Sequence, residues 1–189
     1  MKRWVFLLVC STGVPGQCLW GQRPGAPPVN RLAPSVPSPQ NVVEKMLDAA
    51  RLKPSETVFD LGSGDGRVLV TAAQRFGSKA VGVEISPAQV KASRDRIQKL
   101  KLEHLCTVLE GDALTADLSA ADVVTMYLLT ASNDLLRPNL ERYLKPGARV
   151  VSHDYQIRGW KPARVEKVEA HKREHVLYIY EMPPQKQRP

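Results

Sequence analysis

The chain alternates between short apolar runs and stretches whose apolar residues recur every three or four positions. In residues 40–51, for example, Val43, Met46, Leu47 and Ala50 fall on one side of a helix. The pattern predicts helices over residues 40–51, 67–76, 87–102 and 132–144, and strands over residues 57–61, 80–85, 106–109, 122–129 and 149–153. Strands that alternate with helices predict a parallel sheet joined by right-handed crossovers.

The C-terminal part of the chain has a different pattern. Residues 163–170 and 175–182 alternate in the manner of strands, with Val176 and Tyr178 on one face and Leu177 on the other. The two runs lie close in sequence, which predicts an antiparallel hairpin at the edge of the sheet. The expected fold class is therefore α/β, with a mostly parallel seven-stranded sheet that includes a C-terminal antiparallel hairpin.

The N-terminus begins with two basic residues, Lys2 and Arg3, followed by an apolar run over residues 4–9. This pattern predicts that residues 1–20 form a signal-like or anchoring leader, although a merely apolar start stays open as the alternative. The run is shorter than the about 20 apolar residues of a standard membrane span. We expect the protein to be membrane-associated or exported through this leader, and otherwise cytoplasmic.

The segments around the predicted domain lack apolar periodicity. Residues 21–38 are rich in Pro, Gly and Ser, and seven of the fifteen prolines lie within residues 1–40, which is typical of a linker. The folded domain is predicted over residues 39–182. Residues 183–189 are polar and contain three prolines, so we expect a disordered tail.

Composition narrows the function only a little. The chain has 43% hydrophobic and 24% charged residues, as in ordinary soluble proteins, and a net charge of +8. This excess would favour an acidic partner, an anionic membrane or nucleic acid, but it indicates no specific nucleic-acid binding. The three cysteines have neither metal-site nor disulfide spacing. His171 and His175 are spaced like metal ligands on a helix but lie in a predicted strand region, so no metal site is expected.

The strongest motif is a glycine-rich loop over residues 60–66, between a predicted strand and a predicted helix. Glycines at alternate positions allow a sharp turn and let a ligand approach the backbone closely. Asp60 begins this motif, Glu84 ends the second predicted strand and Asp112 follows the third. Ligands of open α/β sheets bind at the carboxyl ends of the strands, so the three acids predict a binding site there.

These motifs resemble the binding signature of class I methyltransferases, which use S-adenosylmethionine. The resemblance is carried by the D-x-G-x-G-x-G loop, the acid that ends the second strand and the Gly-Asp-Ala after the third, and it covers roughly residues 40–182. It implies a Rossmann-like class I methyltransferase fold and S-adenosylmethionine as the cofactor. The cofactor-binding residues that it implies are Asp60, Gly62, Ser63, Gly64, Asp65, Glu84 and Asp112.

The resemblance also implies individual roles for several of these residues. Gly62 and Gly64 would flank the methionine part of the cofactor, and Asp60 would position its ammonium group, directly or through water. Glu84 would accept both ribose hydroxyls, and Asp112 would bind the adenine amino group. Ionised carboxylates suit these roles because they only accept hydrogen bonds.

A dinucleotide-binding enzyme is a weaker alternative. The NAD and FAD signature is G-x-G-x-x-G, whereas Arg67 follows Gly66 here, so that the third glycine falls one place early. Asp60 and Asp65 would also repel the phosphates of a dinucleotide. A non-catalytic relative that still binds the cofactor is a further alternative.

Other segments narrow the resemblance to a small family that contains the membrane-anchored lysine methyltransferases of mitochondrial proteins. The segments that carry this narrower resemblance are residues 34–39 together with 42–47, residues 122–129 and residues 144–154. Ser35 departs from the family, which usually has an aromatic residue there. The resemblance implies methyl transfer to a lysine side chain of a protein. We expect a protein substrate as the partner and a monomeric enzyme. Small-molecule methylation stays open as an alternative.

The fourth predicted strand bears on the substrate. Enzymes that methylate amide or adenine nitrogen typically have Asn/Asp-Pro-Pro-Tyr there, whereas residues 125–128 read Thr-Met-Tyr-Leu. Tyr127 is the candidate catalytic residue, because we expect it to line an apolar slot that favours the uncharged lysine. The face of the tyrosine ring can also meet the cationic methyl group. His153 and Asp154, at the end of the fifth strand, are weaker candidates.

Overall fold

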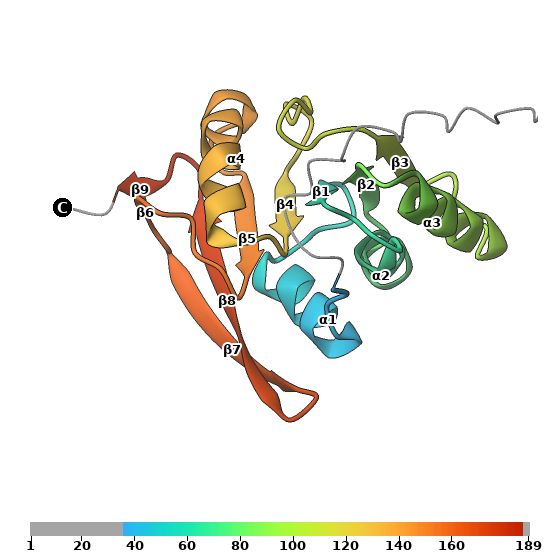
Figure 1. Ribbon diagram of the computed structural model, residues 1–189, viewed down its shortest axis with the longest axis horizontal. Helices are drawn as coiled ribbons and strands as arrows, with labels where there is room; N and C mark the ends of the chain where they lie inside the picture. The colour runs from blue at the N-terminus through green and yellow to red at the C-terminus, as the bar shows by residue number, and fades with distance from the viewer. Residues whose placement is uncertain (1–35, 187–189) are drawn as a thin grey trace, which may run out of the picture.

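The computed structural model describes residues 36–186, which form a seven-stranded sheet with helices on both faces (Figure 1). The helices are α1 (Gln40–Ala49), α2 (Arg67–Phe76), α3 (Pro87–Lys99) and α4 (Thr130–Tyr143). The strands are β1 (Thr57–Leu61), β2 (Lys79–Glu84), β3 (Cys106–Glu110), β4 (Val123–Met126), β5 (Arg149–His153), β6 (Trp160–Lys161), β7 (Arg164–Ala170), β8 (Arg173–Glu181) and β9 (Gln185–Lys186).

The strand order of the large sheet is β3-β2-β1-β4-β5-β8-β7. The first five of these strands are parallel, β8 pairs antiparallel with β5, and β7 pairs antiparallel with β8, as the predicted C-terminal hairpin requires. The order reverses at β1, which lies between β2 and β4. Such a switch point leaves a crevice at the carboxyl ends of the strands, and ligands of open α/β sheets bind there.

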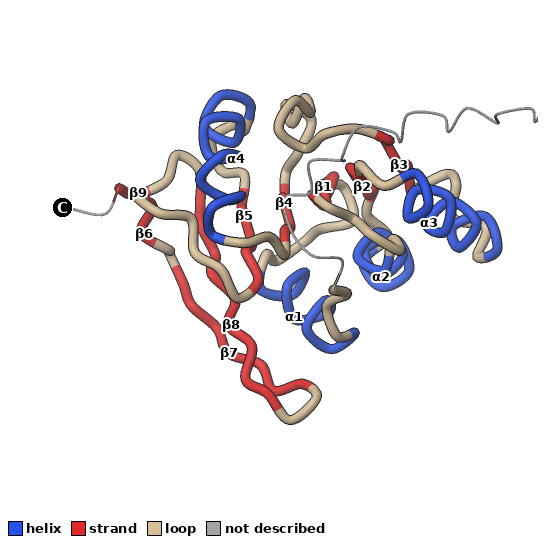
Figure 2. The backbone as a smooth tube through the Cα atoms, in the orientation of Figure 1, coloured by secondary structure: helices blue, strands red, loops and turns tan. Residues whose placement is uncertain are grey.

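Alternate residues of the central strands face two separate cores. Val123 and Val151 pack with α1, α2 and α3, whereas Val124 and Val150 pack with α4. Figure 2 shows α4 on the side of the sheet away from α1 and α2. The strands are buried on both faces, which explains why they read as continuous apolar runs rather than as alternating ones. The two cores hold the carboxyl ends of β1, β2 and β4 at fixed positions.

The fourth strand is shorter than predicted. It ends at Met126 rather than at residue 129, because Met126 pairs with Leu61, the last residue of its neighbour β1. Tyr127 and Leu128 then leave the sheet and line a pocket, and α4 begins at Thr130, two residues before its predicted start. The early end of the strand thus brings its last side chains to the crevice.

The C-terminal hairpin is confirmed, with a tight turn at His171 and Lys172. Both residues have positive φ, 49° and 62°, and Ala170 pairs with Arg173, as in a two-residue hairpin turn. His171 therefore lies in the turn and His175 in β8. The helical spacing of these two histidines does not occur in the structure.

Of the segments predicted to lie outside the folded domain, the structure describes part of the C-terminal tail and the last three residues of the linker. Gln185 and Lys186 pair with Trp160 and Lys161 as β9 and β6, so part of the segment expected to be a disordered tail is a short strand. The predicted leader and most of the predicted linker lie outside the described residues. Within residues 36–186, none of the helices has both the length and the hydropathy that crossing a membrane requires.

Candidate active site

The glycine-rich loop joins the end of β1 to the start of α2. The backbone N–H groups of Gly62 and Ser63 both donate to the carbonyl oxygen of Val83, at 2.9 and 3.2 Å, and so tie the loop to β2. Gly66 has φ of +74°, and a Cβ there would lie 2.1 Å from Oγ of Ser93 in α3. Only glycine allows this close packing of α2 against α3 at the start of the helix.

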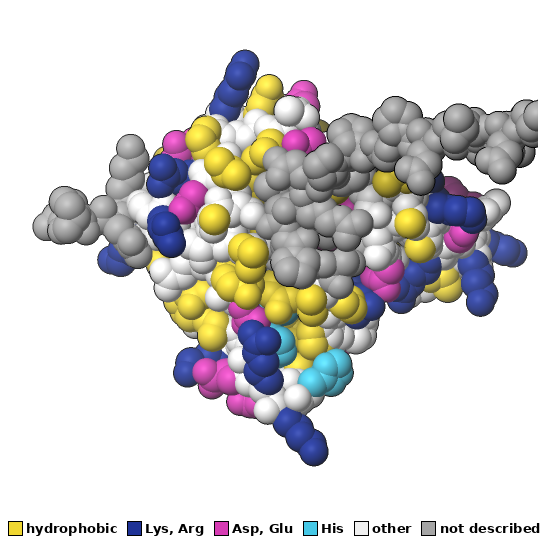
Figure 3. Space-filling model, in the orientation of Figure 1, with side chains coloured by type: hydrophobic (Ala, Val, Ile, Leu, Met, Phe, Trp, Pro, Cys, Tyr) yellow, Lys and Arg dark blue, Asp and Glu magenta, His cyan; other side chains and the backbone are white. Residues whose placement is uncertain are grey.

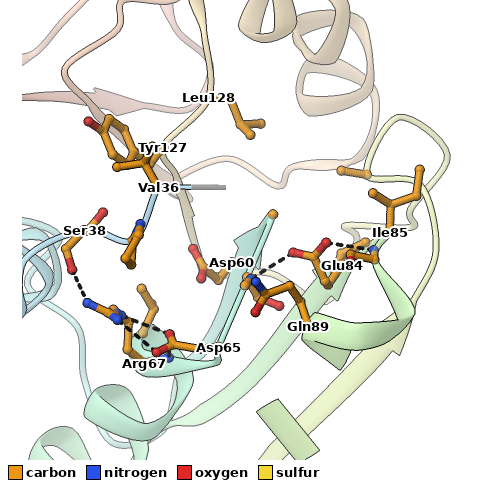
Figure 4. Close-up of a pocket in the computed structure, with 18 of the residues that line it drawn as sticks. Val36, Ser38, Asp60, Asp65, Arg67, Glu84, Ile85, Gln89, Tyr127 and Leu128 are labelled. Atoms are coloured by element: carbon orange, nitrogen blue, oxygen red, sulfur yellow. Dashed lines mark hydrogen bonds and ion pairs between the residues drawn. The ribbon is translucent and has the colours of Figure 1, made fainter. Parts of the chain in front are cut away.

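The loop forms one wall of a pocket with a volume of about 570 Å³. The other walls come from the carboxyl ends of β2 and β4, the loop after β3 and the segment before α1 (Figure 4). All eight residues that the sequence predicts as site residues line this pocket: Asp60, Gly62, Ser63, Gly64, Asp65, Glu84, Asp112 and Tyr127. The structure therefore brings them together, and their contacts with a cofactor stay predictions.

Glu84 ends β2 with its carboxylate fixed by the backbone. Its Oε2 accepts a hydrogen bond from the N–H of Gly64 at 2.9 Å, and its Oε1 accepts one from the N–H of Ser86 at 2.8 Å (Figure 4). Each carboxylate oxygen has room for a second hydrogen bond. The side chain is therefore oriented before any ligand binds and can still accept two hydroxyl groups.

Asp60 is a buried acid at the end of β1. Burial raises the pKa of its carboxyl to about 7, although the hydrogen bond from Thr125 Oγ1 to Oδ1, 2.7 Å long, acts in the opposite direction. The negative charges of Glu84 and Asp65 raise the pKa further. A cation bound beside Asp60 would stabilise its ionised form, which suits the ammonium group of an amino-acid ligand.

Asp65 forms an ion pair with Arg67 at the edge of the glycine loop. Its two oxygens accept hydrogen bonds from Nε and Nη2 of Arg67, both at 2.9 Å, and one also pairs with Arg96 at 3.0 Å. Burial acts to raise the pKa of Asp65, but the hydrogen bonds and charge of Arg67 hold it below its usual value. Arg67 Nη1 in turn donates to the carbonyl oxygen of Ser38 at 2.6 Å.

These contacts join the segment before α1 to the glycine loop and the start of α2, and the joined residues line the pocket (Figure 4). The sequence reasoning did not identify Ser38 or Arg67, because they are 29 residues apart and no motif joins them. Asp112 lies in the loop after β3, where its Oδ1 accepts a hydrogen bond from the N–H of Leu114 at 2.9 Å. Its second carboxylate oxygen has no role in that turn.

Tyr127 lies between the pocket and a group of buried polar residues. Its ring stacks on the imidazole of His153, with centroids 3.8 Å apart, and its hydroxyl donates to Oδ2 of Asp154 at 3.4 Å. Burial, and after it the negative charge of Asp154, raises the pKa of the Tyr127 hydroxyl. The hydroxyl therefore stays protonated at neutral pH, and the ring offers an apolar face to the pocket.

The two weaker sequence candidates belong to this polar group. His153 is fully buried, and its Nδ1 lies 2.9 Å from Oγ of Ser38 while its Nε2 lies 2.8 Å from Nδ1 of His175. Asp154 Oδ2 lies 3.1 Å from the same Nδ1 and 2.7 Å from Nη2 of Arg173. Burial lowers the pKa of His153 to about 4, against the influence of Asp154, so its ring is neutral.

The sequence reasoning missed His175. The signal that could have found it is the alternation in β8, which places His175 on the buried face with Leu177 and Ile179. Among the described residues, the donor atoms of His153, Asp154 and His175 lie within 4.8 Å of one another, as metal ligands can. The guanidinium of Arg173 on Asp154 Oδ2, however, opposes the binding of a cation there.

Comparison with known proteins identifies the family. Residues 60–164, more than half of the chain, match the family described as the ANTKMT methyltransferase domain. A protein-lysine N-methyltransferase of Saccharolobus islandicus is 45% identical over 148 residues, 78% of this chain and 92% of that relative. The adenine nucleotide translocase lysine N-methyltransferase of Mus musculus is 30% identical over 73% of this chain, which spans only 60% of the mouse protein.

A solved structure shares the fold. The RNA methyltransferase of Salinibacter ruber, determined in complex with S-adenosyl-L-homocysteine, is 38% identical, with a TM-score of 0.75 over 82% of this chain and 98% of that one. This similarity confirms the Rossmann-like class I fold that the motifs imply. The chain belongs to the ANTKMT methyltransferase domain family and is an S-adenosylmethionine-dependent methyltransferase.

Proposed function

We propose that the enzyme transfers a methyl group from S-adenosylmethionine to a lysine side chain of a protein. The observation that carries this proposal is the 45% identity to the protein-lysine N-methyltransferase of Saccharolobus islandicus, of which the chain covers 92%. The mouse relative also acts on a lysine, in the adenine nucleotide translocase. The proposal extends the activity of these relatives to this chain.

The pocket fits the cofactor on several independent grounds. A Cβ placed on Gly64 would meet no atom of the described residues within 4 Å, so a ligand can lie close to the backbone there. Asp60 is a buried carboxyl that pairs with no cationic side chain of residues 36–186, and an ammonium group supplies a positive charge. Glu84 holds two oxygens ready for a pair of hydroxyls.

From these features we assign each part of the cofactor to residues of the pocket. Asp60 would hold the ammonium group, Gly62 and Gly64 the methionine chain, Glu84 the ribose and Asp112 the adenine amino group. Ser63 and Asp65 complete the loop. Asp65 acts through Arg67, which it orients with two hydrogen bonds. When bound, S-adenosylmethionine supplies a methyl group on a positively charged sulfur.

The chain's own residues then prepare the nucleophile. A lysine with a reference pKa of about 10.4 must lose a proton before its nitrogen can attack. Tyr127, Leu128 and Val36 give the pocket an apolar lining, which disfavours the charged ammonium. A fixed slot also holds the nitrogen and the methyl group in line, which is the main task of an enzyme in a displacement of this kind.

The test is to incubate the purified enzyme with S-adenosylmethionine labelled in the methyl group and with whole-cell extract. We expect label in protein, and methylated lysine after hydrolysis of that protein to amino acids. The Glu84→Ala variant serves as the control with a damaged cofactor site and should transfer much less label. Label only in small molecules would overturn the proposal.

RNA methylation is a second candidate, favoured by one observation. The Salinibacter ruber protein, which shares 38% identity and almost its full length with this chain, is an RNA methyltransferase. The same labelled extract separates the two candidates, because nuclease releases label from RNA and protease releases it from protein. Label that is sensitive to nuclease alone would favour RNA over a lysine side chain.

We further propose that the enzyme acts as a monomer and that any membrane association depends on residues 1–20. These residues lie outside the described part of the chain, and the basic and apolar pattern at Lys2, Arg3 and residues 4–9 supports the proposal. Gel filtration of the domain over residues 36–189, and membrane fractionation of the full chain beside that domain, would test both statements.

A further inference from the structure

We propose that Ser38, His153, His175 and Asp154 form a path that takes up the proton lost by the substrate amine and carries it away from the pocket. This inference rests on the proposed lysine substrate. Methyl transfer to a lysine releases one proton for each methyl group, and the described residues that form the apolar slot, Tyr127, Leu128 and Val36, offer no group to receive it. The four side chains form a continuous hydrogen-bonded connection from the pocket toward the solvent.

The connection begins at Ser38, which lines the pocket beside Arg67 (Figure 4). Its hydroxyl oxygen lies 2.9 Å from Nδ1 of His153, and Nε2 of the same ring lies 2.8 Å from Nδ1 of His175. Asp154 Oδ2 lies 3.1 Å from that Nδ1. The links from Ser38 to His153 and from His153 to His175 have the length of ordinary hydrogen bonds, and the contact with Asp154 becomes one when Nδ1 of His175 carries the proton, so the transfer needs no movement of the backbone.

The far end of the path reaches the surface. Asp154 pairs with Arg173, whose side chain is 59% exposed, near the start of β8. Figure 3 shows His, Asp/Glu and Lys/Arg side chains next to one another on this side of the molecule, toward the β7–β8 hairpin. Bulk water therefore lies close to the end of the path that is distant from the pocket.

Packing alone does not account for these residues. His153 is 0% exposed and His175 is 5% exposed, and apolar side chains of similar size would fill the same space without the cost of burying polar rings. Both nitrogens of His153 are used, one toward Ser38 and one toward His175. An arrangement that directs one ring between two polar partners is what proton transfer requires.

The transfer can be written with each proton placed. Before transfer, the Ser38 hydroxyl donates to Nδ1 of His153, and the Nε2–H of His153 lies between Nδ1 of His175, 2.8 Å from Nε2, and Oδ2 of Asp154, 3.5 Å from it. The ammonium proton then moves to Oγ of Ser38, the Ser38 proton to Nδ1 of His153, and the Nε2 proton to His175. The amine nitrogen keeps the electron pair that forms the bond to the methyl carbon, and the electrons of the broken S–C bond stay on sulfur.

The proton ends on His175, where the imidazolium faces the Asp154 carboxylate. The titratable and charged groups that face the two rings are Tyr127 after β4, Asp154 after β5 and Arg173 in β8. Burial keeps His153 neutral, so it passes a proton on rather than holding it. Ser38 would touch the substrate, whereas His153, His175 and Asp154 act through it as positioning residues.

The test compares His153→Asn with the wild type across pH, on the protein substrate labelled in the extract experiment. The Asn amide keeps a hydrogen-bonding group near Ser38 but cannot relay a proton. At pH 7 we expect kcat to fall about 100-fold with little change in KM, a loss typical of removing a proton acceptor. The variant's rate should then rise about tenfold per pH unit toward the pKa of lysine, near 10.4, because solution provides the neutral amine.

Two further variants complete the experiment. Ser38→Ala should show the same pH dependence as His153→Asn, and Ser38→Thr, which keeps the hydroxyl, should restore most of the rate. His171→Asn is the matched control: it changes an exposed histidine four residues from His175, at φ of +49°, which Asn tolerates. Its pH profile should match that of the wild type.

The outcomes are distinguishable. A loss by the same factor at every pH, in both His153→Asn and Ser38→Ala, would show a structural role and overturn the path while leaving the lysine substrate intact. A wild-type enzyme that labels no amine would overturn the proposed function, and the path with it. A rate of Ser38→Ala equal to that of the wild type at pH 7 would also contradict the inference.

Discussion

The carboxylate of Glu84 accepts a hydrogen bond from the backbone N–H of Gly64, 2.9 Å away and 20 residues earlier in the chain. The contact joins the end of β2 to the middle of the glycine loop. It means that one side chain both shapes the loop and presents oxygens to the pocket. Removing it should damage cofactor binding in two ways at once.

We therefore expect Glu84→Ala to weaken binding of S-adenosylhomocysteine by about 1–3 kcal/mol, the usual cost of leaving buried polar groups unpaired. Isothermal titration calorimetry measures the change. Glu110→Ala is a suitable control, because Glu110 is exposed on β3 and pairs in register with Glu84. Unchanged affinity in Glu84→Ala would remove this residue from the ribose role.

Cofactor affinity should also depend on pH through Asp60. The carboxyl has a raised pKa of about 7, so in the free protein it is largely protonated below pH 7. An ammonium group binds the ionised form, so binding should release a proton and affinity should fall as the pH drops from 7.5 to 5.5. Calorimetry in buffers with different ionisation enthalpies measures the number of protons released.

Two variants check the assignment to Asp60. Asp60→Asn should bind more weakly at pH 7.5 and lose the pH dependence. Thr125→Val removes the hydrogen bond that lowers the pKa of Asp60, so the midpoint should move to higher pH. A wild-type pH dependence that persists in Asp60→Asn would assign the titration to another group.

The sequence predicts well which residues of the glycine loop and of the strand ends come together at the pocket, and the reason is local. Asp60, Glu84 and Asp112 each follow or end a strand, and parallel strands bring their carboxyl ends to one edge of a sheet. The glycine loop is contiguous in sequence, so its turn can be inferred without knowledge of the rest of the fold. The pocket is lined by the three acids and by Gly62, Ser63, Gly64 and Asp65 of the loop.

The substrate side of the site is harder to predict because it depends on contacts between distant segments. Ser38 meets His153 across 115 residues, and His153 meets His175 across 22. The second contact depends on the register of β5 against β8, in which His153 pairs with Leu177. A shift of one residue would point His175 to the other face, and the pattern of one strand does not specify its register with another.

The tie between Arg67 and Ser38 leads to another prediction. We expect Arg67→Lys to weaken cofactor binding by about 1 kcal/mol, because a lysine keeps the charge but loses the two-pronged contact with Asp65. The peptide over residues 36–42 should exchange its amide hydrogens faster, which mass spectrometry measures. Arg75→Lys is the control, since Arg75 pairs with Glu44 away from the pocket. Equal amide hydrogen exchange of residues 36–42 in both variants would contradict the prediction that Arg67 holds this segment in place.

Tyr127 makes two kinds of contact that substitutions can separate: its ring stacks on His153, and its hydroxyl contacts Asp154. Tyr127→Phe keeps the ring, with its centroid 3.8 Å from that of His153, and loses only the weak hydrogen bond of 3.4 Å to Asp154. We expect its kcat to fall no more than about threefold, since such a long contact contributes little. Tyr127→Ala removes the wall of the slot and should lower kcat about 100-fold, because a small misplacement of the nucleophile has effects of that size.

Cofactor affinity decides how these two results are interpreted. If the ring only lines the lysine slot, both variants should bind S-adenosylhomocysteine as the wild type does, so that the loss in Tyr127→Ala appears in kcat and in KM for the protein substrate. A loss of cofactor affinity in Tyr127→Ala would place the ring on the cofactor side instead. An equal loss of kcat in both variants would assign the effect to the hydroxyl and to Asp154, against the proposed role of the ring.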